Sequence, residues 1–324
     1  MFRKILGGFL ALFLLLAIAL LATAPRGLVH EVQVADIDGN LDEWLAIRER
    51  KVSESAAIIP DTEKRIRWFQ GHKNSKTRYS LVYFHGFSAT RQEIAPVGAL
   101  IAHALNANLF ETRLTGHGHQ HNPLVDVRAE DWLDDAAEAL AIGAAIGESI
   151  IVMGTSTGAT LSLAMTEHPL FKQVSKIILL SPNFGLSDTN TEFLTWPGGP
   201  QLAYLVAGNT HSWTPRNELQ AQYWSYSYPM DAVVEMMRLV QYVRAKLPMQ
   251  LEQSLLTIYS PQDTVVDTGG ITLAFEQMDS PRKQLITIPG SVDRDNHVLA
   301  GDIMLPENNE LVTDHIVRFV TADE

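Results

Sequence analysis

A serine lies at the centre of a glycine-flanked motif, Gly154-Thr155-Ser156-Thr157-Gly158. Residues 149–153 before it form an apolar, β-branched run typical of a buried strand, and residues 159–165 after it are typical of a helix. A sharp turn from strand to helix would lift the Ser156 side chain above the strand end, and the two glycines would allow close backbone approach. The helix start offers free N–H groups to an oxyanion. The motif therefore predicts a nucleophilic serine.

A serine hydroxyl needs a base within hydrogen-bond reach, and the base needs a carboxylate that orients it. Asp263 follows the predicted strand 255–259, and His297 follows the predicted strand 284–288. The order serine, aspartate, histidine, each after a strand, is the one expected when the serine lies on a strand-to-helix turn. We therefore predict Ser156 as nucleophile, His297 as base and Asp263 as its orienting acid.

Three other aspartates compete with Asp263 for the role of orienting acid. Asp267 is the nearest rival, although Thr268 and Gly269 behind it also suit a helix cap. Asp293 and Asp295 lie closer to His297 in the sequence, and we expect them to be solvated in the loop.

Two backbone N–H groups are candidates for an oxyanion hole, which needs donors aimed at the developing negative charge. One belongs to Thr157, the residue after the nucleophile. The other belongs to Phe87 in His85-Gly86-Phe87, which follows the predicted strand 79–84. We expect His85 and Gly86 to shape this loop, with His85 not acting as a second base.

Three alternating histidines, His117, His119 and His121, raise the possibility of a metal site. Two glycines interrupt the stretch and it has no strand character, so its side chains have no reason to share one face. We expect a structural loop and no metal or other cofactor.

Strand-like and helix-like segments alternate over residues 78–184 and again over 254–324, which predicts a doubly wound, mostly parallel α/β sheet. Residues 185–253 break the alternation with helical and loop signals and no good strand, so we expect a helical cap there. Its aromatic and methionine residues are candidates for an acyl pocket. Residues 26–77 are expected to form an N-terminal extension with an early strand near 65–69.

Composition limits the possible partners of the chain. Its net charge of -12 argues against binding to nucleic acid, which needs a basic face. The absence of cysteine excludes disulfides, thiolate nucleophiles and cysteine-ligated zinc. The oligomeric state has no signature in the sequence.

The N-terminus carries a membrane signal. Arg3 and Lys4 precede an uninterrupted apolar or small stretch over residues 5–24, which as a helix is about 30 Å long and matches a hydrocarbon core. We expect residues 1–25 to form an uncleaved anchor that leaves the catalytic domain on the exported, periplasmic side. A cleaved signal peptide and a secreted protein are the alternative, although Pro25 would occupy the scissile bond. A buried core helix is a third reading.

The chain resembles the α/β-hydrolase family of serine hydrolases, in particular its monoacylglycerol lipase and carboxylesterase group. The resemblance rests on the segments His85-Gly86-Phe87, Gly116-His117-Gly118, Gly154-x-Ser156-x-Gly158, Asp263-x-Val265-Val266 and Asn296-His297-Val298, and it spans roughly residues 78–322. It implies cleavage of small or lipid carboxylic esters through an acyl-enzyme beneath a cap. Thr155 and Thr157 depart from the bulkier residues usual in this group, which leaves the subfamily and its substrate open.

Two kinds of alternative remain at this point. A thioesterase, a peptidase or amidase, or an acyltransferase would use the same three side chains. A non-catalytic, membrane-tethered binding module that kept the fold is a more distant possibility, although such proteins usually lose one of the three.

Overall fold

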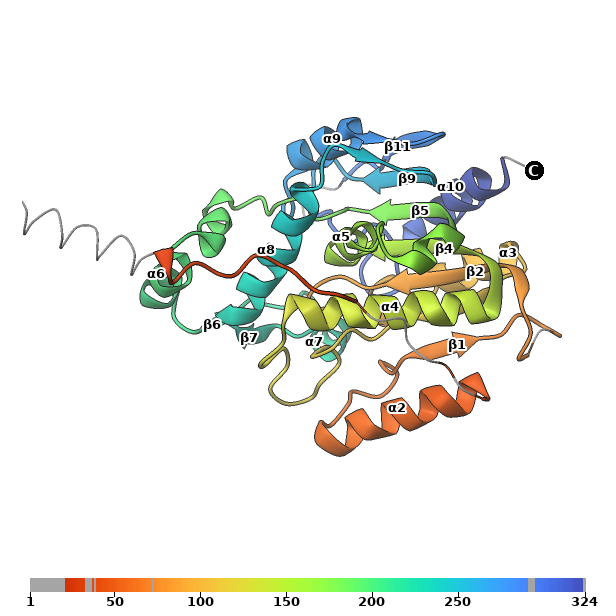
Figure 1. Ribbon diagram of the computed structural model, residues 1–324, viewed down its shortest axis with the longest axis horizontal. Helices are drawn as coiled ribbons and strands as arrows, with labels where there is room; N and C mark the ends of the chain where they lie inside the picture. Colours follow the sequence, from red (N-terminus) through yellow and green to blue (C-terminus); the bar gives the residue numbers. More distant parts are fainter. Residues whose placement is uncertain (1–20, 33–36, 38, 72, 291–294, 323–324) are drawn as a thin grey trace, which may run out of the picture.

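A central sheet organises the part of the chain that the computed structural model describes, namely residues 21–32, 37, 39–71, 73–290 and 295–322 (Figure 1). In these residues the sheet has seven strands in the order β1-β3-β2-β4-β5-β9-β11. They are β1 (Arg65–Arg67), β2 (Thr77–Phe84), β3 (Asn108–Glu111), β4 (Gly147–Thr155), β5 (Val174–Leu180), β9 (Ser254–Tyr259) and β11 (Lys283–Thr287). β1 is antiparallel to β3, and all other pairs are parallel.

Both faces of the sheet are buried, as expected for parallel strands joined by helical crossovers. In the central strand β4, Ile150 and Val152 belong to one apolar cluster, and Ile151 and Met153 belong to the other. All four side chains are fully buried. The continuous apolar sequence of β4 therefore results from burial on two sides, with successive side chains pointing to opposite faces.

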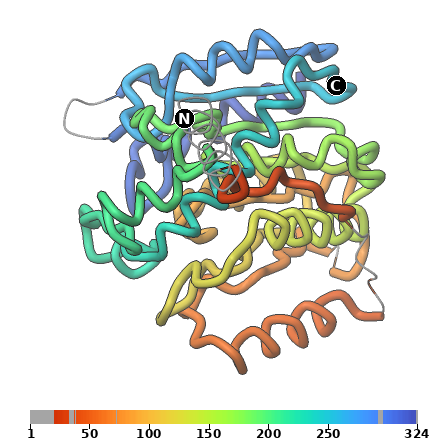
Figure 2. Tube along the Cα trace, turned by 60° about the vertical axis from the view of Figure 1, so that its left-hand side comes forward, coloured from red at the N-terminus to blue at the C-terminus, as the bar shows by residue number. Residues whose placement is uncertain are grey.

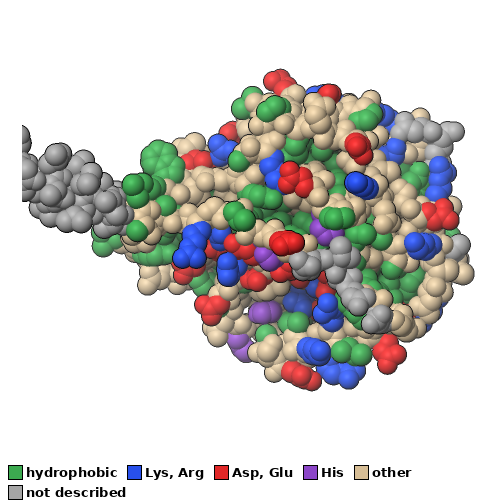
Figure 3. Space-filling view, in the orientation of Figure 1, with side chains coloured by type: hydrophobic (Ala, Val, Ile, Leu, Met, Phe, Trp, Pro, Cys, Tyr) green, Lys and Arg blue, Asp and Glu red, His purple; other side chains and the backbone are tan. Residues whose placement is uncertain are grey.

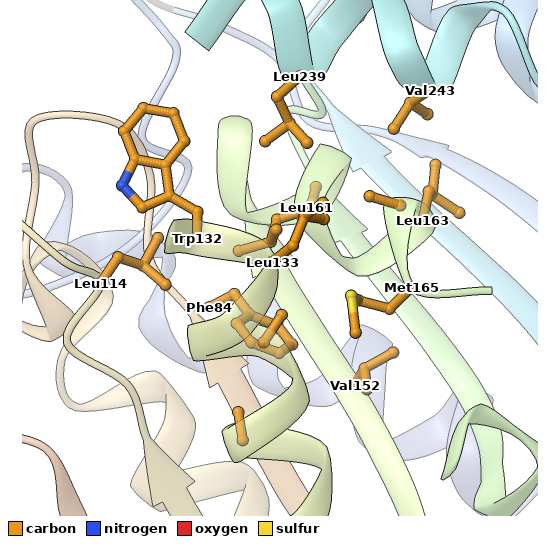
Figure 4. Packing of buried hydrophobic residues seen from close by; sticks show 14 of the residues in the cluster. Phe84, Leu114, Trp132, Leu133, Val152, Leu161, Leu163, Met165, Leu239 and Val243 are labelled. Carbon is orange, nitrogen blue, oxygen red and sulfur yellow. The ribbon is translucent and has the colours of Figure 1, made fainter. Parts of the chain in front are cut away.

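Helices cover both faces (Figure 1). α4 (Ala129–Ile146), α5 (Thr157–Ala164), α8 (Met230–Arg244) and α9 (Thr268–Gln277) contribute to the first cluster, and α3 (Val97–Ala104) and α10 (Asn309–Thr321) to the second. In Figure 4 the side chains of α4, α5 and α8 pack together above Phe84 and Val152. The predicted α/β core with a mostly parallel sheet is confirmed.

The cap lies between β5 and α8. It contains the short helix η3 (Thr189–Thr195), α6 (Gly199–Ala207), β6 (Thr210–Ser212), α7 (Glu218–Tyr223) and β7 (Ser227–Pro229). The expectation that this region contains no strand is wrong, because β6 and β7 pair as an antiparallel hairpin. Three-residue strands with several polar side chains show no alternation that a sequence pattern could reveal. The helix expected within the cap, α8, packs against α4 and α5 of the core.

The remaining elements are short or peripheral. α2 (Leu41–Ser55) lies outside β1 in the N-terminal extension, with the Asn40 side chain accepting a hydrogen bond from the Glu43 N–H at its start (Figure 1). β8 (Met249–Gln250) pairs with β10 (Met278–Asp279). The single-turn helices are η1 (Arg91–Ile94), η2 (Pro169–Gln173) and η4 (Pro306–Asn308).

Residues 21–32 run across the outside of the molecule beside α8, as the two views agree (Figures 1 and 2). Arg238 Nε of α8 donates to the Arg26 carbonyl at 2.8 Å. The predicted anchor, residues 1–25, lies almost wholly outside the described residues. Within the described ranges, no helix combines the length and the apolar composition needed to cross a bilayer.

Candidate active site

Ser156 lies on the turn between β4 and α5 with a left-handed backbone, φ 53° and ψ -119°. A residue with a Cβ adopts such a conformation only where its surroundings enforce it. The Ser156 N–H donates to the Leu180 carbonyl at 2.8 Å, and its own carbonyl accepts from the N–H of Asn183 at 3.2 Å. These bonds fix the serine at the carboxyl end of the central strand.

The glycines of the motif allow this turn because neighbouring backbone leaves no room for a side chain. A Cβ on Gly158 would lie 2.2 Å from the Phe84 carbonyl oxygen, and one on Gly154 would lie 2.5 Å from the Ala159 nitrogen. A Cβ on Gly86 would lie 3.4 Å from that of Ser156 and 3.0 Å from Glu93 Oε2. Close approach of backbone is therefore the requirement at Gly154 and Gly158, whereas at Gly86 the nearest atoms belong to the side chains of Glu93 and Ser156.

Replacing Gly158 by alanine is expected to destabilise the protein, because the contacted atoms are backbone of β2 and its following loop and must shift. The expected loss is about 3 kcal/mol of unfolding free energy, which lowers Tm by roughly 4 °C in a chain of this length. Calorimetry checks this, with Gly27→Ala as the matched control, since a Cβ there meets no atom within 4 Å. Equal Tm values for the two variants would contradict the packing argument.

His297 and Asp263 lie side by side in the loops after β11 and β9. Their Nδ1 and Oδ2 atoms are 2.7 Å apart, and the Asp263 side chain is fully buried. The other carboxylate oxygen of Asp263 accepts from the N–H groups of Val265 and Val266 at 2.8 and 3.1 Å. Burial opposes charge on His297, but the Asp263 carboxylate outweighs it and raises the pKa of His297 above 6.5.

The rival aspartates have other partners. Asp267 is the N-cap of α9 and accepts from the Gly269 N–H at 2.9 Å. Asp295 accepts from the backbone N–H of His297 at 3.3 Å and from Arg216 Nε at 3.2 Å. Asp293 lies outside the described residues.

The two predicted oxyanion donors both line the cavity that Ser156 and His297 also line. Thr157 begins α5, so its N–H belongs to the first turn, where helices leave donors unpaired. Neither the Phe87 N–H nor the Thr157 N–H meets a hydrogen-bond acceptor among the described residues. Both N–H groups are therefore unpaired within the described residues, as the donors of an oxyanion hole must be.

His85 stabilises the loop that carries Phe87 through hydrogen bonds to backbone. Its Nε2 accepts from the Leu114 N–H at 3.0 Å, and its Nδ1 lies 2.9 Å from the Gly86 carbonyl. Burial lowers the pKa of His85 to about 4, so the ring is neutral, with its proton on Nδ1. A ring held in this way shapes the loop and has no free nitrogen to act as a base.

His117 is similarly committed to backbone. Its Nε2 accepts from the Ser88 N–H at 3.1 Å, and its Nδ1 lies 3.1 Å from the Thr115 carbonyl. In the described part of the chain, no three histidine, aspartate or glutamate side chains are grouped so that they could hold a metal ion.

Sequence reasoning missed a buried carboxylate beneath the oxyanion loop. Glu93 Oε1 accepts from the Gly86 N–H at 2.6 Å and from the Tyr83 hydroxyl at 2.5 Å. The Tyr83 hydroxyl also lies 3.0 Å from Thr155 Oγ1, next to the nucleophile. Burial raises the pKa of Glu93 to about 7, although both hydrogen bonds act in the opposite direction. The sequence offered no signal for this role, because Glu93 follows Arg91 and Gln92 as an acid would in an ordinary helix start.

Two substitutions of Glu93 are expected to distinguish its hydrogen bonds to Gly86 and Tyr83 from the effect of its charge on His297. Glu93→Ala leaves two buried donors unpaired, which costs roughly 1–3 kcal/mol and is expected to lower kcat about tenfold or more. Glu93→Gln keeps the acceptor oxygen but removes the charge that helps to raise the pKa of His297. Because the base acts when neutral, the acid limb of kcat/KM is expected to move to lower pH in Glu93→Gln. Steady-state kinetics across pH would test this, and unchanged profiles in both variants would contradict it.

Asn183, also missed, supports the other side of the site. Its amide nitrogen lies 3.2 Å from Thr157 Oγ1 and 3.5 Å from Met236 Sδ, and its carbonyl oxygen accepts from the Gly185 N–H at 3.0 Å. It lies three residues after the end of β5, but an asparagine after a strand is too common to single out.

A cavity of about 680 Å³ separates these residues from the cap. Five of the aromatic and methionine residues of the predicted cap line it, namely Trp213, Trp224, Tyr228, Met230 and Met236. Leu194, Ala203, Ala207 and Val233 add aliphatic surface. These walls suit an apolar group.

Residues 75–292 match the model of the family described as serine aminopeptidase, S33. The chain belongs to this family of α/β-hydrolases. A thermostable monoacylglycerol lipase of Bacillus sp. (strain H-257) is 25% identical over 209 residues, which cover 64% of this chain and 79% of that lipase. This S33-family chain is thus similar to a lipase in sequence.

Solved structures of low identity share the fold of this S33-family hydrolase. A structure from the study of the metagenome-derived lipolytic enzymes LipS and LipT has a TM-score of 0.66 at 17% identity, covering 82% of this chain and 99% of its own. The monoacylglycerol lipase of Paleococcus ferrophilus has a TM-score of 0.59 at 13% identity, and the match covers 81% of this chain and 100% of the chain of that lipase.

Proposed function

We propose that this α/β-hydrolase cleaves carboxylic esters of lipid type through an acyl-enzyme. Ser156 Oγ attacks the ester carbonyl while His297 takes its proton, and the Phe87 and Thr157 N–H groups stabilise the oxyanion. The bond to the alcohol then breaks, and His297 returns the proton to the leaving oxygen. Water attacks the acyl-Ser156 ester with His297 again as base, releasing the acid and the free serine. Asp263 orients His297 and stabilises its charged form.

One observation carries this proposal. Ser156, held at φ 53°, lines the same cavity as His297, whose Nδ1 lies 2.7 Å from the buried Asp263 carboxylate. A non-catalytic module has no need for a strained serine that lines one cavity with a histidine bound to a buried carboxylate. Similarity to the Bacillus lipase favours a lipid ester.

A substrate panel tests the class of bond. We expect the full-length protein in detergent to hydrolyse a medium-chain monoacylglycerol and a p-nitrophenyl ester, with kcat/KM above that for the matching acyl thioester and aminoacyl anilide. Highest activity on the anilide would contradict the ester proposal and favour the peptidase alternative. Transfer of the acyl group to an added alcohol in place of water would indicate an acyltransferase.

We further propose that residues 1–25 anchor the protein in a membrane with its catalytic domain on the exported side. The support is the sequence itself, an uncharged apolar stretch over residues 5–24 after Arg3 and Lys4. Protease added outside spheroplasts is expected to digest the catalytic domain, and the mature N-terminus is expected to retain these residues. An N-terminus near residue 25 would favour the secreted alternative.

A further inference from the structure

Helix α6 is apolar on both sides. Ala203 and Ala207 on its inner side line the cavity beside Ser156. On its outer side Leu202, Leu205 and Val206 are 58%, 83% and 78% exposed. A surface helix normally exposes polar residues to water. The apolar outer side of α6 therefore indicates that this helix separates the apolar cavity from a second apolar environment outside the protein.

The apolar surface continues beyond α6. Phe193 and Trp196 are 47% and 55% exposed, with their rings in edge-to-face contact at 4.8 Å. We name Phe193, Trp196, Leu202, Leu205 and Val206 the cap face. Residues 193–215 contain no aspartate, glutamate, lysine or arginine, in a chain in which 19% of residues are charged. In Figure 3 hydrophobic side chains gather at this end of the molecule. An exposed patch of this kind marks an interaction surface.

The described chain begins beside the cap face. Leu21 is 64% exposed, and Thr23 Oγ1 accepts from the Gly198 N–H at 2.8 Å, directly before α6. The Arg26 carbonyl accepts a hydrogen bond from Arg238, so the segment that follows Thr23 is attached to α8. Residues 5–20, which precede Leu21, are all apolar or small.

We propose that the cap face lies against the lipid bilayer that the N-terminal segment enters, so that α6 is the wall between the acyl cavity and lipid. The bilayer is favoured over a second copy of the chain because an apolar stretch long enough to span it ends at this surface. Trp196 and the leucines suit the interfacial region. This proposal rests on the proposed function and adds that the ester substrate reaches the cavity from a lipid surface.

Site-specific labelling tests the contact, and the absence of cysteine makes each label unique. Full-length Leu205→Cys carrying an NBD fluorophore is reconstituted in phosphatidylcholine vesicles with and without doxyl-labelled lipid. We expect its emission to shift to shorter wavelength and to be quenched by doxyl groups, as for a side chain roughly 5–10 Å below the bilayer surface. The matched control is Leu273→Cys on α9, which is 57% exposed and lies away from the cap.

Two results would overturn the proposal. The first is identical emission and quenching at positions 205 and 273. The second is a shift at position 205 that grows with protein concentration and is insensitive to doxyl lipid, which would assign the surface to a second copy of the chain.

A kinetic experiment tests whether the cap face contributes to catalysis on lipid, with substitutions that lie outside the cavity. Leu205→Glu combined with Val206→Glu is expected to lower hydrolysis of a long-chain monoacylglycerol in vesicles about tenfold, while hydrolysis of a soluble short-chain ester stays unchanged. Leu273→Glu is expected to change neither rate. Equal rates of the double variant and the wild type on vesicles would contradict the proposal. Failure of the wild type on every ester would instead overturn the proposed function, and the label would still report the contact.

Discussion

Ser156→Ala is expected to lower kcat for ester hydrolysis by roughly 10⁶-fold, as removal of the nucleophile does in comparable sites. The substitution removes one oxygen from a small buried side chain, so the fold should persist. The residual rate would come from the cavity and the Phe87 and Thr157 donors acting on a water molecule.

The control for this variant is Ser53→Ala, in which the altered hydroxyl lies on the exposed side of α2 and donates to the Arg50 carbonyl. Its kcat is expected to equal that of the wild type. The measurement is hydrolysis of a p-nitrophenyl ester by both variants, with circular dichroism as a check of folding. More than a tenth of wild-type kcat in folded Ser156→Ala would contradict the assignment of the nucleophile.

Asp263→Asn is expected to lower kcat by about 10⁴-fold. Asparagine at this position can place its N–H₂ group against His297 Nδ1, which favours the tautomer with its proton on Nε2, where the base must be free. The substitution also removes the charge that raises the pKa of His297. The acid limb of the remaining activity is therefore expected to shift to lower pH, because an imidazole with a lower pKa stays neutral at lower pH.

Asp267→Asn provides a matched control four residues away. Asp267 caps α9 through the Gly269 N–H, and asparagine caps a helix almost as well as aspartate. Its kcat should stay within about twofold of the wild type, with a stability loss of a few tenths of a kcal/mol. A greater loss of kcat in Asp267→Asn than in Asp263→Asn would reverse the assignment of the orienting acid.

The core of the fold was predictable because its signals are local. A continuous apolar run such as that of β4 follows from burial on both faces, and Ser156 and Asp263 each follow a buried strand of this kind, whereas His297 follows the half-exposed edge strand β11. Parallel strands end at one edge of the sheet, so three loops distant in sequence converge there. The hairpin of β6 and β7 had no such signal, since its pairing depends on the fold of the cap around it.

Glu93 shows why part of the site was not predictable. Its sequence context is that of an ordinary helix start, yet the fold buries it beneath Gly86 and against Tyr83. Its role depends on three segments that meet only after folding. Likewise, the sequence could propose the aromatic and methionine residues of the cap as a group, but only the packing of the cap separates Trp213, which faces the cavity, from Trp196, which faces outward.

The central claim is that Ser156 is an activated nucleophile, and covalent labelling tests it most directly. The purified full-length protein in detergent micelles is treated with a fluorophosphonate, and its intact mass is measured beside that of Ser156→Ala. The account predicts one adduct on the wild type, located at Ser156 by peptide mapping, and none on the variant. A folded wild-type protein without an adduct, or an adduct that persists in Ser156→Ala, would contradict it.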